Sequence, residues 1–164
     1  MRAFLAYVVA VLVLVNLFGS REARAADAVS SHSAAVTAAP AAKMKAVVRA
    51  WNDRLDAGDN AGIARLFAVP ALVIQGAYSY LLRTRAEVAE WFSLLPCAAR
   101  IVSIAVRGRY ATAVFRLANR GSTPCDAPGA LAAARFEIVG GKIASWEQVP
   151  VPVPQPKAPS EPVA

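Results

Sequence analysis

Side chains that commonly perform chemistry are few in this chain. Its only histidine, His32, lies between two serines close to the N-terminus. Imidazole is the usual general base near neutral pH and the commonest metal ligand. The sequence after His32 therefore offers neither a histidine-dependent catalytic triad nor most types of zinc site. We expect the folded part of the protein to hold no metal ion and no cofactor.

The chain has two cysteines, Cys97 and Cys125. They form no Cys-x-x-Cys redox motif and are not accompanied by other zinc ligands, so a structural disulfide is the favoured interpretation. Closing a loop of this length stabilises a fold by roughly 3 to 4 kcal/mol when the effect is treated as chain entropy. The alternative is a pair of free buried thiols. Disulfides persist in oxidising compartments, and the N-terminal sequence, described next, predicts export to such a compartment.

The N-terminus has the features of a cleavable signal peptide. Arg2 provides a positive start, residues 3–15 are an unbroken apolar run, and Ala23-Arg24-Ala25 is the small-x-small pattern that a signal peptidase recognises. We predict a signal peptide at residues 1–25 and an exported protein that is secreted, periplasmic or associated with the cell envelope. The alternative is an uncleaved membrane anchor. The run is short for an anchor, because a spanning helix needs roughly 20 apolar residues.

The charge of the mature chain excludes one class of partner. Removal of residues 1–25 takes away three arginines and one glutamate, which lowers the formal net charge from +7 to +5. The remaining arginines are scattered and make no basic stripe that could follow a phosphate backbone. We therefore expect no nucleic-acid partner.

Two helices are predicted at the start of the domain, after a flexible linker at residues 26–42. Apolar side chains recur at intervals of three and four from Met44 to Leu55, which indicates an amphipathic helix. Asp59 is placed to cap a second, short helix that has Phe67 on its apolar face.

A third helix and five strands are predicted farther along the chain. Thr84 to Glu87 forms a capping box, a frequent opening of a helix. Gly140-Gly141 joins the last two strands as a two-residue hairpin turn. The proline-rich residues 151–164 can join neither a helix nor a sheet, so we expect a disordered tail. The predicted strands cover residues 71–75, 101–106, 110–119, 131–139 and 142–149.

Two segments of the chain resemble a known superfamily. Residues 57–59 (Ala-Gly-Asp), followed by residues 62–68 (Gly-Ile-Ala-Arg-Leu-Phe-Ala), resemble the helix-turn-helix opening of ketosteroid isomerases and SnoaL-like cyclases. Residues 135–143 and Trp146 resemble the closing hairpin of the same nuclear transport factor 2-like (SnoaL-like) superfamily. Together they bracket residues 43–150 as one domain. The resemblance implies an α+β, cone-shaped, cystatin-like fold, in which N-terminal helices pack on the concave face of a curved antiparallel β-sheet.

The resemblance also implies where a pocket would lie. In the isomerases the pocket carries a tyrosine, an aspartate base and a second acid, and the matching positions here are Trp51, Gln75 and Ala132. An indole, an amide and a methyl group cannot exchange a proton at neutral pH. The residues at these three positions therefore exclude the isomerase mechanism.

The pleat of the predicted strands decides which side chains line this pocket. If Ala132 faces inward, so does Ala134, and a two-residue turn then pairs Ala134 with Glu147. Glu147 would point inward, where the loss of water raises the pKa of a carboxyl group. A single β-bulge would instead move Glu147 to the surface. The side chains expected to line the cavity are Trp51, Leu55, Phe67, Gln75, Trp91, Phe92, Phe136 and Glu147.

The outer face of the same hairpin is a predicted contact surface. Trp146 is expected beside Arg135, where the guanidinium can rest on the indole ring. An exposed tryptophan on a sheet that this superfamily often uses for association suggests a homodimer.

Three hypotheses of function remain. The preferred one is an exported domain that binds a small hydrophobic molecule or a partner and performs no chemistry. The second is an enzyme similar to SnoaL-like proteins or limonene epoxide hydrolases (an isomerase, cyclase or hydrolase), which acts on a small hydrophobic substrate through Glu147. The third is a structural dimer of the cell envelope whose cavity is filled by aromatic side chains. One carboxylate without a partner is weak support for catalysis, so the enzyme ranks second.

Overall fold

The computed structural model describes residues 40–153. From Lys43 onward these residues belong to one compact unit. The predicted signal peptide, residues 26–39 of the linker and residues 154–164 of the tail lie outside the described residues. Residues 40–42, expected to end the linker, already belong to the first helix, and residues 151–153 have no regular secondary structure. Within residues 40–153, no helix combines the length and the apolar character needed to cross a membrane.

The first two helices form as the apolar pattern and the capping residue predict. The N-terminal helix covers residues 40–56 and buries its predicted apolar stripe in the core. Asp59 caps α2 (Asn60–Leu66) by accepting a hydrogen bond from the Gly62 N–H at 2.7 Å. This bond satisfies one of the donors that a helix leaves free at its start.

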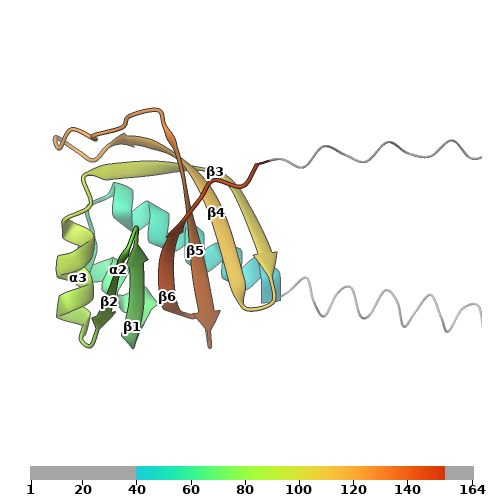
Figure 1. Cartoon of the computed structure of the whole chain (residues 1–164). Helices are drawn as coiled ribbons and strands as arrows, with labels where there is room; N and C mark the ends of the chain where they lie inside the picture. The colour runs from blue at the N-terminus through green and yellow to red at the C-terminus, as the bar shows by residue number, and fades with distance from the viewer. Residues whose placement is uncertain (1–39, 154–164) are drawn as a thin grey trace, which may run out of the picture. The chain divides into compact units, whose positions relative to one another are not determined.

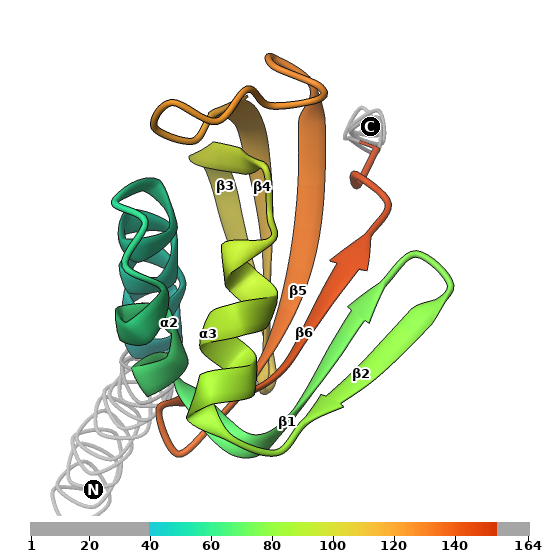
Figure 2. The ribbon, with the colours of Figure 1, turned by 90° about the vertical axis from the view of Figure 1, so that its left-hand side faces the viewer.

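The third helix, α3 (Arg85–Ser93), begins at the predicted capping box. The Thr84 hydroxyl accepts a hydrogen bond from the Glu87 N–H at 3.2 Å. The Glu87 carboxylate accepts one in return from the Arg83 N–H at 2.7 Å, one residue before the cap. Helices α2 and α3 lie side by side within the curve of the sheet (Figure 2).

Six strands of the described residues form one curved sheet, and the helices lie on its concave side (Figures 1 and 2). The spatial order is β2-β1-β6-β5-β4-β3. The expected antiparallel sheet is a mixed sheet, since β1 and β6 pair in parallel and the other neighbours are antiparallel. The chain crosses to the far edge after β2 and returns through three antiparallel pairings, which sets the direction of β6. The strands are β1 (Phe67–Gln75), β2 (Tyr78–Leu82), β3 (Cys97–Arg107), β4 (Tyr110–Asn119), β5 (Leu131–Val139) and β6 (Lys142–Val149).

The beginning of the sheet departs from the prediction. Phe67 starts β1 instead of ending α2, and Pro70 lies inside the strand after a cis peptide bond. The sequence pattern does not predict β2, because its side chains are mostly exposed and show no alternation. β3 begins at Cys97 instead of residue 101. The predicted bounds of β4, β5 and β6 are confirmed.

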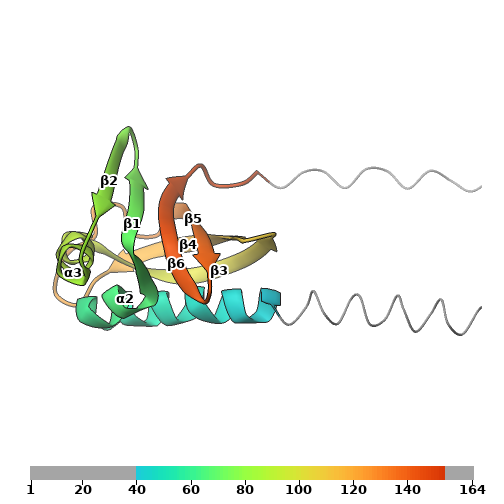
Figure 3. The same ribbon diagram turned by 90° about the horizontal axis from the view of Figure 1, so that it is seen from below.

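Aromatic rings occupy the centre of the core, between the sheet and the N-terminal helix that runs along it (Figure 3). The Trp51 ring centroid lies 5.1 Å from that of Phe136 and 5.9 Å from that of Phe92. Phe67, Phe92 and Phe136 are almost fully buried. These three phenylalanines are packed as core instead of forming the walls of an open cavity.

Arg120, which follows β4, joins the ends of two helices to the sheet. Its guanidinium donates hydrogen bonds to the carbonyl oxygens of Leu55 at 3.1 Å, Phe92 at 2.7 Å and Leu95 at 3.1 Å, and to the Asn60 side chain. The carbonyls lie at, or just after, the C-terminal ends of the N-terminal helix and α3, where the helix dipole is negative. Burial lowers the pKa of Arg120 below its ordinary value. The sequence pattern gives no sign of this contact.

Candidate functional site

The hairpin of β5 and β6 has the predicted turn but not the predicted register. Ile138 pairs with Ile143 as expected, after which a bulge shifts the pairing by one residue. Arg135 then lies opposite Glu147, where the expected register placed Ala134. Because side chains alternate along a strand, this shift moves every later side chain of β6 to the other face.

Glu147 consequently lies on the outer face of the sheet. Its carboxylate accepts a hydrogen bond from the Arg135 Nε at 3.1 Å and a second one from Nη2. The same guanidinium lies 5.5 Å from the centre of the Tyr110 ring. The expected inward position of Glu147 is therefore wrong, and its carboxylate is not available to a molecule in the cavity.

Trp146 takes the inward position that Glu147 was expected to hold. It is 6% exposed, and its ring centroid lies 5.5 Å from that of Trp91 and 6.4 Å from that of Trp51. The expected contact between Trp146 and Arg135 on a dimer face is wrong, since the bulge puts them on opposite faces. Of this pair, only Arg135 lies on the outer face.

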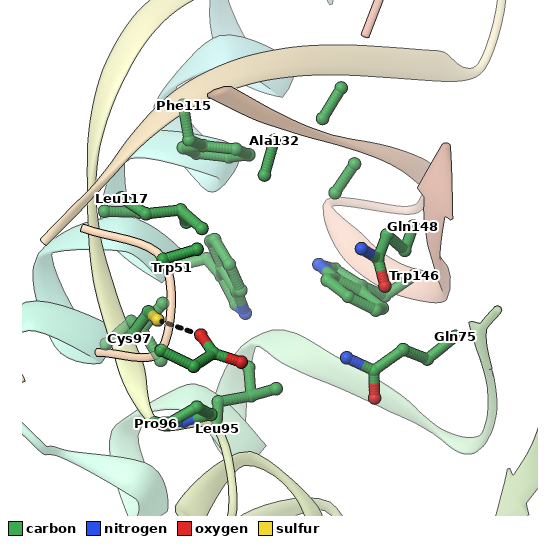
Figure 4. A pocket seen from close by; sticks show the side chains of 16 residues that line it. Trp51, Gln75, Leu95, Pro96, Cys97, Phe115, Leu117, Ala132, Trp146 and Gln148 are labelled. Carbon is green, nitrogen blue, oxygen red and sulfur yellow. Dashed lines mark hydrogen bonds between the residues drawn. The ribbon is translucent and has the colours of Figure 1, made fainter. Parts of the chain in front are cut away.

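A cavity of about 300 Å³ lies between the sheet, the N-terminal helix and the loop before β5 (Figure 4). Trp51 and Leu55 reach it from the helix and Gln75 from the end of β1. Ala132 of β5 lies on the same wall, so the three positions matched to the isomerase residues do surround one cavity. Phe67, Trp91, Phe92, Phe136 and Glu147 do not line it.

The predicted disulfide between Cys97 and Cys125 is present. It ties the loop between β4 and β5 to the start of β3, and Cys97 and Asp126 form part of the cavity wall. An Asp126 carboxylate oxygen lies 3.2 Å from the Cys97 sulfur (Figure 4). Both sulfurs are bonded to each other and cannot serve as thiolate ligands, so this cluster is a structural clamp and not a metal site.

The polar groups that line the cavity differ in how exposed they are to solvent. Gln148 and Asp126 are exposed and Gln75 is half-buried. The indole N–H groups of Trp51 and Trp146 are buried and have no hydrogen-bond acceptor within residues 40–153. Figure 4 shows both indole nitrogens and the Gln75 amide turned toward the same open space. In the wall that the described residues form, Asp126 is the only ionisable group, so the interior holds donors but no acid or base.

Sequence reasoning missed Trp146, Gln148 and Asp126 as cavity residues. No periodicity reveals Trp146 or Gln148, because their direction depends on the bulge. Asp126 could have been predicted from the sequence. It is the neighbour of Cys125, and the predicted disulfide places Cys125 beside Cys97.

Comparisons with known proteins identify the fold. Neither a protein-family model nor a curated protein matches the chain. A solved structure of a putative polyketide cyclase from Sinorhizobium meliloti is 18% identical, with a TM-score of 0.53, over 65% of this chain and 98% of that one. A nuclear transport factor 2-like protein of unknown function from Burkholderia xenovorans is 17% identical, with a TM-score of 0.52, over 68% of this chain and 88% of that one. A putative ketosteroid isomerase from Kribbella flavida is 16% identical, with a TM-score of 0.51, over 74% and 90%.

At such low identity the likeness concerns the fold and not the activity. The resemblance seen in the sequence is confirmed at that level. The curved sheet with its helices on the concave side is the fold of nuclear transport factor 2-like and ketosteroid isomerase-like proteins.

Proposed function

We propose that this chain is an exported domain that binds a small, mostly apolar molecule in its cavity without transforming it. The observation that carries this proposal is the composition of the wall, which combines aromatic and aliphatic surface with a few polar groups. Binding sites for small molecules have this composition, and their volumes start at about 300 Å³. The signal-peptide pattern and the disulfide support export.

An enzyme that works through Glu147 has no support in this geometry. General acid or base catalysis requires a titratable group within hydrogen-bond reach of the substrate. Glu147 is on the other side of the sheet and is paired with Arg135. Asp126 is exposed in the loop before β5 and is therefore not held in a buried, water-excluding site.

The test uses N-phenyl-1-naphthylamine, an uncharged aromatic dye whose fluorescence rises when it leaves water. We expect one saturable site on the full chain. Ala132→Phe adds a ring to the cavity wall and should weaken binding at least about tenfold. Ala105→Phe is the matched control, since Ala105 is exposed on the outer face of the sheet.

Circular dichroism establishes that both variants are folded before the dye is added. Binding that is lost in Ala132→Phe and kept in Ala105→Phe supports the cavity as the site. Unsaturable binding, or a loss in Ala105→Phe alone, would overturn the proposal, because the dye would then bind non-specifically or to the outer face of the sheet.

A further inference from the structure

The two indoles in the cavity are donors without acceptors. Trp51 is 2% exposed and Trp146 is 6% exposed, and each has its Nε1 buried. They come from different elements, the N-terminal helix and β6, and their ring centroids are 6.4 Å apart. Buried indole N–H groups normally find a hydrogen-bond partner. Two unpaired indole N–H groups in one cavity therefore suggest that both serve the same ligand.

A ligand with an acceptor oxygen would satisfy these groups. Both indole nitrogens face the open space of the cavity beside the Gln75 amide (Figure 4). A carbonyl oxygen has two lone pairs and can accept from more than one donor. A hydrocarbon of the same shape would fill the space but leave both donors unpaired, which is costly in buried surroundings.

The charges around the cavity favour an uncharged ligand over an anion. The wall contains no lysine or arginine among the described residues, and its one ionisable group, Asp126, is a carboxylate. An anion placed there would lose its water without gaining a counter-charge. The carboxylate of Asp126 would in addition repel it.

Resting on the proposed binding function, we infer that the ligand is an uncharged, mostly apolar molecule with a carbonyl-type oxygen, which accepts hydrogen bonds from the indole N–H groups of Trp51 and Trp146. The aromatic and aliphatic wall holds the hydrocarbon part of the molecule. The bulge in β6 is essential to this site, because without it Glu147 would stand where the second donor is.

The test compares three probes of closely similar shape by isothermal titration calorimetry on the full chain. They are 2-acetylnaphthalene, its alkene counterpart 2-isopropenylnaphthalene, and 2-naphthoate. We expect the ketone to bind about tenfold or more tightly than the alkene, since two hydrogen bonds distinguish them. The carboxylate should bind more weakly than the ketone.

The variants Trp51→Phe and Trp146→Phe keep an aromatic ring and remove one donor each. Each should lower the affinity for the ketone about fivefold and leave that for the alkene within about twofold. Trp91→Phe is the control, because Trp91 contacts Trp146 but does not line the cavity. In the ligand-free chain the three tryptophans also provide three indole N–H resonances, and the ketone alone should shift those of Trp51 and Trp146 downfield.

The outcomes separate the inference from the function on which it rests. Equal binding of ketone and alkene overturns the inference and leaves the cavity a binding site. Tightest binding of the carboxylate does the same. Failure of all three probes to bind overturns both the inference about the ligand and the proposed binding function. The probe series and the resonance shifts use the unaltered chain, so they decide the matter even where a tryptophan variant does not fold.

Discussion

Replacing Arg120 by methionine should detach the ends of two helices from the sheet while keeping much of the apolar stem. In the native structure the guanidinium donates to the carbonyl oxygens of Leu55, Phe92 and Leu95 and to the Asn60 side chain. Arg120→Met removes all four of these hydrogen bonds, although the Leu55 and Phe92 oxygens keep backbone N–H donors. It also removes a positive charge from two negative helix ends.

The size of the effect follows from these bonds. Each lost bond to a partly buried acceptor costs on the order of 1 kcal/mol, and water reaches some of them because Arg120 is only half-buried. We expect the free energy of unfolding to fall by about 3 kcal/mol. For a domain of this length that corresponds to a drop in Tm of about 10 °C.

Thermal unfolding followed by circular dichroism measures the drop, and Arg116→Met is the matched control. Arg116 is exposed on β4, the strand that Arg120 follows, and within residues 40–153 it donates a single hydrogen bond, to the Gly129 carbonyl at 2.9 Å. Its loss should lower Tm by less than about 3 °C. Arg120→Lys keeps the charge but not the planar fork, and should recover less than half of the lost stability. A Tm for Arg120→Met within 3 °C of the control would refute the role of Arg120 as a connector.

Three other substitutions test the register, the disulfide and a helix cap. Glu147→Gln should leave dye binding within about twofold, since it alters a surface ion pair with Arg135; a loss of binding would show that Glu147 faces the cavity. Cys97→Ala/Cys125→Ala should lower the free energy of unfolding in urea by about 3 to 4 kcal/mol, and unchanged stability would contradict a formed disulfide. Asp59→Ala should cost about 1 kcal/mol through loss of the α2 cap, whereas Asp53→Ala, at an exposed position, should cost much less.

Much of the fold could be predicted from patterns among residues that are close together in the sequence. Asp59 and Thr84 mark helix starts because a cap and its N–H partner lie within three residues of each other. The glycine pair in the last turn sets the bounds of β5 and β6. Two cysteines allow only one intramolecular pairing, so Cys97 and Cys125 could be joined without knowledge of the fold.

The candidate site was less predictable because it depends on contacts between distant residues. The match to the superfamily placed Trp51 and Gln75 on the cavity, yet the phenylalanines predicted beside them are core. Arg120 was not predicted at all, since its acceptors belong to three separate segments that only the folded chain brings together.

The sequence by itself determined the helix caps, the closing hairpin, the disulfide and the absence of histidine from the described domain. Only the tertiary structure decided the direction of β1 against β6 and the faces on which Trp146 and Glu147 lie. Both registers of β6 are compatible with its local pattern, because one bulge exchanges the two faces. Packing selects between them. The indole of Trp146 buries apolar surface against Trp51 and Trp91, whereas a carboxylate in its place would lose water without a partner.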